Sequence, residues 1–240
     1  MPTPRMLVIL PAFNEADNLP KTLTHIRLVV PHADILVIND GSLDNTGEVA
    51  AAYGAHVLNM PYNVGIGAGV QTAFQFAHRY DYDIVVRNDG DGQHAPDGIT
   101  RLVTAMETQN YDVVVGSRFL DAGDYGTSPS RLLGINILRS LLRLLTGWPV
   151  TDPTSGFGAF NRRAIALFAQ HYPHDYPEPE AIFILHRCGF TMGEIPITMQ
   201  RREHGQSSIT LLRSIYYMVK VVLALLIQRM RRKPVLQGLR

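Results

Sequence analysis

The chain has 240 residues, 46% of them hydrophobic, which is enough to bury the core of one sizeable domain or two small ones. Its 22 basic and 21 acidic residues leave a net charge of +1, which argues against a nucleic-acid partner held by bulk charge. The single cysteine, Cys188, excludes an internal disulfide framework and a cysteine-rich zinc site, and it fits a reducing, cytoplasmic location.

The first half of the chain alternates between short apolar runs and segments with helical spacing of apolar residues. Strands are predicted at 6–10, 35–38, 56–58, 84–86 and 113–115. Helices are predicted at 16–30, 44–53 and 97–109, and a glycine-rich stretch at 63–69 opens another that continues to residue 80. This order predicts an α/β fold with a doubly wound, mostly parallel sheet and helices on both faces. Ligands of such folds bind beyond the C-terminal ends of the strands.

The second half departs from this rhythm. Helices are predicted at 131–146 and 179–188, and extended segments at 157–160 and 191–197. A polar loop at 200–208 precedes a last helix that ends in basic residues at 229–233. The N-terminus is typical of a strand and not of a signal peptide, and no apolar run reaches the roughly 20 residues of a membrane span. We expect a single domain over 1–240 with two functional halves, 1–120 and 121–240.

Three of the predicted strands end in acidic loops. These loops are PAFNE at 11–15, NDGS at 39–42 and NDGDGQH at 88–94. Acids and glycines are ordinary turn formers after strands, so any one loop is explained equally well by its turn. Because the ends of parallel strands share one edge of the sheet, three such loops together favour a binding site there.

The third loop has the spacing of a metal site. Asp89 and Asp91 flank a glycine, and two carboxylates so placed can bind one hard cation directly or through water. Mg2+ and Mn2+ prefer such oxygen ligands, and Gln93 can add a carbonyl oxygen. The sequence has no Gly-Lys-Ser/Thr triplet of a P-loop, and its glycines at 65–69 lack the spacing of a dinucleotide fingerprint.

Taken together, six segments resemble glycosyltransferase family 2, in particular its dolichyl- and polyprenyl-phosphate mannosyl- and glucosyltransferase branch. They are PAFNE at 11–15, NDGS at 39–42, NVGIGAGV at 63–70, DGDGQH at 89–94, GSRF at 116–119 and DPTSGF at 152–157. The resemblance covers roughly residues 6 to 208. It implies a GT-A fold and transfer, with inversion, from a UDP-, GDP- or dTDP-linked sugar bound by the first half of the domain.

The resemblance also implies roles for individual residues. The nucleotide-binding set would be Pro11, Phe13, Glu15, Asp40, Gly67 and Asp89. The set holding Mg2+ or Mn2+ on the diphosphate would be Asp89, Asp91 and Gln93, with Asp91 also catalytic. The chain departs from the family pattern at Phe13, usually tyrosine, at Asn39, usually an acid, and at Gly158, where the family often has an arginine.

The acceptor is expected to contact the second half of the domain. A lipid phosphate is already anionic and calls for cations, and arginine matches phosphate geometry. The residues that resemble the branch's acceptor ligands are Arg118, Arg131, Arg201, Arg202 and Ser207. By the same resemblance, Arg118 and Arg131 would also be catalytic. Arg131, with Arg139 and Arg143, is equally well explained as a solvated helix face.

A sugar hydroxyl acceptor would instead require a general base. Glu180 or Asp152 is a candidate, although Glu180 is also explained by the favourable effect of an acid in the first turn of a helix. This alternative is a family 2 enzyme of cell-surface polysaccharide synthesis. From other classes, a nucleotidyltransferase would usually carry a basic loop after the first strand, and a sugar-nucleotide binder without catalysis would not need both metal acids.

Two segments suggest peripheral association with the cytoplasmic face of a membrane. Residues 131–146 and 211–233 combine apolar side chains with lysine and arginine, as interfacial helices do. The same pattern also suits helices that pack into the core or into a homodimer. A separate membrane partner is a further possibility.

Overall fold

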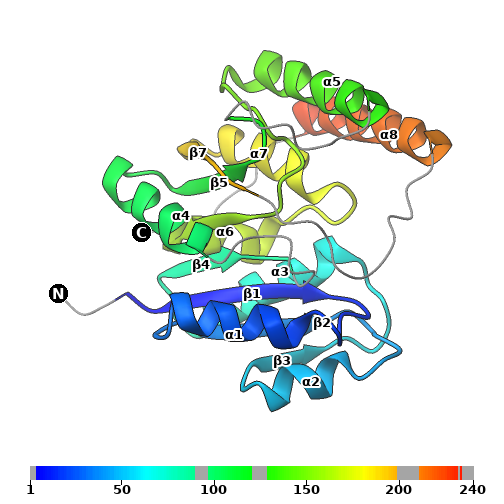
Figure 1. Ribbon diagram of the computed structural model, residues 1–240. Coiled ribbons are helices and arrows are strands. Elements are labelled where there is room, and N and C mark those ends of the chain that lie inside the picture. Colours follow the sequence, from blue (N-terminus) through cyan, green and yellow to red (C-terminus); the bar gives the residue numbers. More distant parts are fainter. Residues whose placement is uncertain (1–3, 90–96, 121–128, 199–210, 232, 234–240) are drawn as a thin grey trace.

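A computed structural model describes residues 4–89, 97–120, 129–198, 211–231 and 233, and within them one seven-stranded sheet forms the centre of the molecule (Figure 1). The strands are β1 (Met6–Ala12), β2 (Asp34–Asn39), β3 (His56–Asn59), β4 (Ile84–Arg87), β5 (Val113–Ser117), β6 (Gly158–Asn161) and β7 (Met192–Pro196). Their order across the sheet is β3-β2-β1-β4-β6-β5-β7. All neighbours are parallel except that β6 runs antiparallel to both β4 and β5. The predicted, mostly parallel sheet is therefore confirmed.

Helices cover both faces of this sheet. In the described ranges they are α1 (Leu19–Val29), α2 (Thr46–Ala52), α3 (Ile66–Arg79), α4 (Asp97–Gln109), α5 (Pro129–Thr146), α6 (Arg162–His171), α7 (Pro177–Arg187) and α8 (Leu211–Met230). One core cluster joins α1, α2 and α4 to one face, and a second joins α3, α6 and α7 to the other. Residues 6–10 of β1 are all buried, because a strand covered on both sides has no solvent face.

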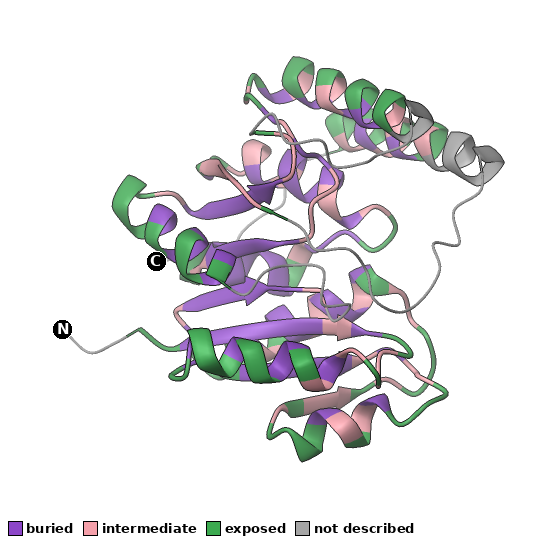
Figure 2. Cartoon of the chain, viewed as in Figure 1, coloured by how far each residue is buried: buried purple, intermediate pink, exposed green. Residues whose placement is uncertain are grey.

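A third cluster lies outside the second helix layer. It joins Leu138 and Leu142 of α5 and Val221 and Leu225 of α8 to α7. Figure 1 shows α5 and α8 side by side at the edge of the molecule, and Figure 2 shows that their outward faces are exposed. The two helices that the sequence marks as amphipathic thus bury one face each and leave the other open.

Some boundaries differ from the prediction. α1 begins at Leu19 and not at residue 16, because residues 16–18 form a turn, and Pro20 then suits the first helical turn. The helix α6 was not predicted. Asn161 caps it, its side-chain oxygen accepting from the Ala164 N–H at 3.0 Å, and this Asn-x-x-Ala start lacks the acid of a capping box.

Candidate functional site

The loops after β1 and β2 form one unit at the C-terminal edge of the sheet. Asn14, with φ of 55°, accepts from the Leu43 N–H at 2.8 Å and donates its own N–H to Ser42 Oγ at 3.0 Å. The Glu15 N–H donates to Thr46 Oγ1 at 3.0 Å. This unit presents the Phe13 ring, which is 44% exposed, and the half-buried Glu15 side chain. Phe13 and Glu15, predicted to contact the nucleoside, therefore lie together.

Asp40 has a structural task at the same edge. Its buried carboxylate accepts from the Val64 N–H at 2.7 Å and the Gly65 N–H at 3.1 Å. A side chain on Gly41, whose φ is 70°, would lie 2.5 Å from the Asn63 nitrogen. Asp40 thus holds the segment before α3 against the end of β2. Its predicted contact with the nucleoside stays a prediction.

Gly67 lies in the first turn of α3, where it is buried. A Cβ added there would overlap the carbonyl oxygen of His174, in the connection between α6 and α7. The close approach of these two backbones explains why this residue is glycine. Pro11 lies within β1, paired with Ile38 of β2. The nucleotide-binding roles predicted for both residues remain untested by this geometry.

A buried cation lies beneath the end of β4. Arg87 is 3% exposed and donates to Tyr172 Oη at 3.0 Å and Glu178 Oε1 at 2.8 Å, and it lies 3.7 Å from Asp89 Oδ1. Burial lowers the pKa of Arg87, but Tyr172, Glu178 and Asp89 more than offset this effect and hold its pKa above the ordinary value. Arg87 therefore links Asp89 to α7.

Sequence reasoning missed this cluster, although a charged residue at the end of a buried strand was its signal. Arg87 is directly opposite Gly158 in the β4–β6 pair, and its Nη2 lies 2.6 Å from where a Cβ on Gly156 would be. Directly opposite residues of an antiparallel pair share a face of the sheet. An arginine at 158, as the family pattern suggests, would project from the same face as Arg87. In this chain the guanidinium on that face therefore comes from Arg87 of β4 and not from residue 158 of β6.

Asp89 offers a carboxylate at the open end of β4, with 32% of its side chain exposed. A carboxylate oxygen in this position suits Mg2+ or Mn2+. Beside it, both polar atoms of the buried Asn88 amide lack a hydrogen-bond partner among the described residues. Asp91 and Gln93 lie outside the described residues, and within the described ranges no three His, Cys, Asp or Glu side chains form a metal-binding group. The described part therefore supplies one ligand of the predicted set, and that ligand fits the metal.

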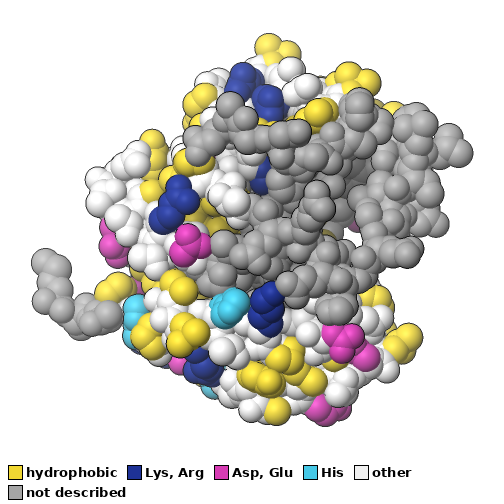
Figure 3. All heavy atoms as spheres, in the orientation of Figure 1, with side chains coloured by type: hydrophobic (Ala, Val, Ile, Leu, Met, Phe, Trp, Pro, Cys, Tyr) yellow, Lys and Arg dark blue, Asp and Glu magenta, His cyan; other side chains and the backbone are white. Residues whose placement is uncertain are grey.

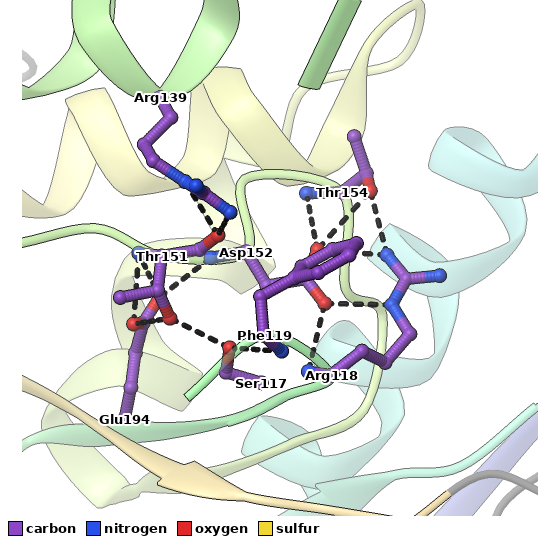
Figure 4. A network of polar contacts seen from close by, with 8 residues as sticks. All are labelled: Ser117, Arg118, Phe119, Arg139, Thr151, Asp152, Thr154 and Glu194. Carbon is purple, nitrogen blue, oxygen red and sulfur yellow. Dashed lines mark hydrogen bonds and ion pairs between the residues drawn. The ribbon is translucent and has the colours of Figure 1, made fainter. Parts of the chain in front are cut away.

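On the acceptor side, Arg118 is paired with Asp152 (Figure 4). Asp152 is fully buried, and its two oxygens accept from Arg118 Nε at 2.6 Å and Nη2 at 2.7 Å. The Arg118 side chain is 7% exposed. This geometry gives Asp152 a structural partner, and its predicted use as a general base stays a prediction. The phosphate-binding role predicted for Arg118 is not tested.

Glu180 contacts α8. It is buried on α7 and accepts a hydrogen bond from Gln228 of α8, and burial raises its pKa. Glu178, two residues earlier, is the acid of α7 that reaches Arg87. The predicted catalytic role of Glu180 stays a prediction. The Arg131 side chain and the residues Arg201, Arg202 and Ser207 lie outside what the structure describes, so their predicted roles are untested.

A mostly parallel α/β sheet whose strand ends carry an aromatic ring, acids and a candidate metal ligand has the features of a transferase with a GT-A fold. Residues 7–168 match the family model for glycosyl transferase family 2, and the chain belongs to this family. The family resemblance seen in the sequence is therefore confirmed, as is the prediction of a glycosyltransferase.

Known relatives extend this result. The chain is 34% identical to an undecaprenyl-phosphate mannosyltransferase of Micrococcus luteus, over 86% of this chain and 88% of that protein. It is 32% identical to a polyprenol monophosphomannose synthase of Mycolicibacterium smegmatis, over 87% and 82%. Its fold is similar to glucosyl-3-phosphoglycerate synthase of Mycobacterium tuberculosis in complex with Mn2+, UDP and glucosyl-3-phosphoglycerate, with TM-score 0.68, 21% identity and coverage of 94% and 80%.

Proposed function

We propose that the protein transfers a hexose, with inversion, from a nucleotide-diphosphate sugar to a polyprenyl or dolichyl phosphate. The two relatives described above, named for sugar transfer to such lipids, match nearly the whole chain. The observation that carries the proposal is the state of the candidate bases. Asp152 and Glu180 are both buried and hydrogen-bonded, which suits a phosphate acceptor because it needs no base. A sugar hydroxyl acceptor is the second candidate.

The residues at the strand ends divide the work on the donor. Phe13 and Glu15 would contact the base and ribose, and Asp40 holds the segment before α3 at the same edge of the sheet. Asp89, with Asp91 and Gln93, would hold Mg2+ or Mn2+. When bound, this cation neutralises the diphosphate and makes it a better leaving group. Arg87 keeps Asp89 in place, and Arg118 and Arg131 would meet the acceptor phosphate.

The test is a transfer assay with the purified chain. UDP-, GDP- and dTDP-linked hexoses are offered with Mn2+ or Mg2+ and a short-chain polyprenyl phosphate, and the glycolipid is detected by mass spectrometry. Asp89→Ala and Asp91→Ala should each lower the rate by three or more orders of magnitude, about 4 kcal/mol of barrier. Transfer only to a sugar hydroxyl would refute the proposal that the acceptor is a lipid phosphate. Full activity of both variants in excess chelator would refute the proposed metal site.

We further propose that the protein docks peripherally on the cytoplasmic face of an anionic membrane through α5 and α8. Among the helices described, none is long and apolar enough to span a membrane. The outer surface of the pair exposes large hydrophobic side chains, namely Leu133, Leu144, Leu223, Ile227 and Met230. Figure 3 shows hydrophobic and basic side chains together over α5. Lys220, Arg229 and Arg231 are exposed on or beside α8, and each basic residue near anionic lipid contributes about 1 kcal/mol.

Co-sedimentation with liposomes tests this docking. Binding to anionic vesicles should weaken at high salt and should be reduced in Leu223→Glu/Ile227→Glu. The control Leu28→Glu adds a charge at an exposed leucine of α1 and should bind like wild type. Protein that stays in the supernatant with anionic vesicles at low salt would show that the face does not dock. A dimer mass lost in the double variant would instead assign the face to a homodimer.

A further inference from the structure

A polar network around Thr151 joins α5 to the segment that carries Arg118 (Figure 4). Arg139 of α5 donates twice to the Thr151 carbonyl oxygen, from Nε at 2.9 Å and from Nη2 at 2.6 Å. Its Nη1 donates to Asn136 Oδ1 at 3.1 Å. Two donors on one carbonyl fix both the distance and the angle between α5 and residue 151.

Thr151 is in turn hydrogen-bonded to β5 and to Glu194 of β7. Its hydroxyl donates to Glu194 Oε2 at 2.5 Å, and its backbone N–H donates to the same oxygen at 2.9 Å. Because the Thr151 proton goes to Glu194, the Ser117 hydroxyl donates to Thr151 Oγ1, at 2.6 Å, and accepts from the Phe119 N–H at 3.1 Å. Each of these two hydroxyls thus donates one hydrogen bond and accepts another. The segments around 117–119 and 151–154 are therefore held as one unit.

Arg118 belongs to the same unit. Asp152 accepts from the Arg118 N–H at 3.1 Å as well as from its guanidinium, and Thr154 Oγ1 accepts from Nη2 at 2.6 Å. The Phe119 ring lies 5.6 Å from the guanidinium carbon of Arg118 and 5.4 Å from that of Arg139. Arg139 therefore contacts this unit at the Thr151 carbonyl and at the Phe119 ring.

We propose that Arg139 is a positioning residue that sets the separation between Arg118 and Arg131. This inference rests on the proposed function, in which both arginines bind one acceptor phosphate. They come from different elements, the end of β5 and the first turn of α5, so one phosphate can engage both only when α5 is held at a fixed distance from β5. Arg139 follows Arg131 on the same helix, about 12 Å further along its axis.

The test compares Arg139→Met and Arg139→Lys with the control Arg143→Met. Arg143 carries the same charge on the same helix, but among the described residues it makes one hydrogen bond, to the Val150 carbonyl at 2.9 Å, and none to Thr151 itself. Both Arg139 variants should raise the KM for a short-chain polyprenyl phosphate about tenfold or more, since small misplacements of binding groups are costly. Lysine is not expected to rescue, because a point cation lacks the guanidinium fork. The kcat and the affinity for nucleoside diphosphate should stay within about twofold of wild type.

Hydrogen exchange supplies a readout that does not depend on the acceptor. The N–H groups of Arg118 and Phe119 donate to side chains of the unit, and that of Asp152 donates to Glu194, so all three should exchange faster in Arg139→Met and not in Arg143→Met. Unchanged exchange in Arg139→Met would show that Arg139 does not hold α5 to the unit around Thr151. Faster exchange with an unchanged acceptor KM, or an equal KM effect in Arg143→Met, would overturn the positioning role. Absence of lipid transfer in the wild type would refute the proposed function and with it the positioning role. The hydrogen-exchange comparison would still show whether Arg139 holds α5 to the unit around Thr151.

Discussion

Replacement of Asp152 by asparagine distinguishes a structural carboxylate from a catalytic base. The wild-type side chain is fully buried, and Arg118 and Thr154 surround it with donors. Asparagine would turn one acceptor oxygen into a donor that faces these donors. It would also leave the guanidinium of Arg118, 7% exposed, without its counter-charge.

The structure sets the size of the expected effect. Removal of one partner from a buried ion pair costs about 3–5 kcal/mol, because the remaining charge stays out of water. In a chain of this size each kcal/mol moves Tm by about 2–4 °C, so Asp152→Asn should melt about 6–20 °C below wild type. Arg118→Met should also destabilise, but the double variant should recover at least about 1 kcal/mol relative to the sum of the singles.

Urea unfolding at pH 7 of the two single variants and the double variant measures these free energies. The pH profile of transfer is recorded for Asp152→Asn alongside. A variant with wild-type stability that has lost transfer together with the acidic limb of its pH profile would show that Asp152 is the base. Single effects that simply add would show that the ion pair is not the source of stability.

Three further predictions concern the donor side and the sheet edge. Glu15→Ala and Asp40→Ala should weaken nucleoside diphosphate binding more than they slow transfer, and unaltered affinity by calorimetry in both would remove them from the pocket. Gly67→Ala should cost about 1–3 kcal/mol in urea unfolding, because its Cβ overlaps backbone, whereas Gly69→Ala meets only a side-chain methyl at 3.2 Å and should cost less. Burial raises the pKa of Glu194 above its ordinary 4.5, so the stability it contributes is complete below that pH and is lost as pH rises through the raised value. The unfolding free energy of wild type should therefore fall more steeply above pH 4.5 than that of Glu194→Gln, and parallel curves would contradict this assignment.

The sequence by itself determined the order of strands and helices in the first half of the chain and the edge that carries the donor site. Periodicity of apolar residues is a local property, so continuous apolar runs marked the buried strands, and the helix 97–109 was predicted with its observed ends. The acids at 15, 40 and 89 followed three of these strands, and parallel pairing then placed them together. The six sequence motifs also indicated the family to which the chain belongs.

Only the tertiary structure decided which partner each charged side chain takes. The direction of β6 and its register place Arg87 opposite Gly158, and folding brings Glu178 to that cation from a helix distant in sequence. In the same way Asp152 is committed to Arg118. Residue type and spacing describe what a carboxylate can do, but its burial and its nearest donor depend on contacts between segments far apart in the chain, because desolvation and hydrogen bonding act through space.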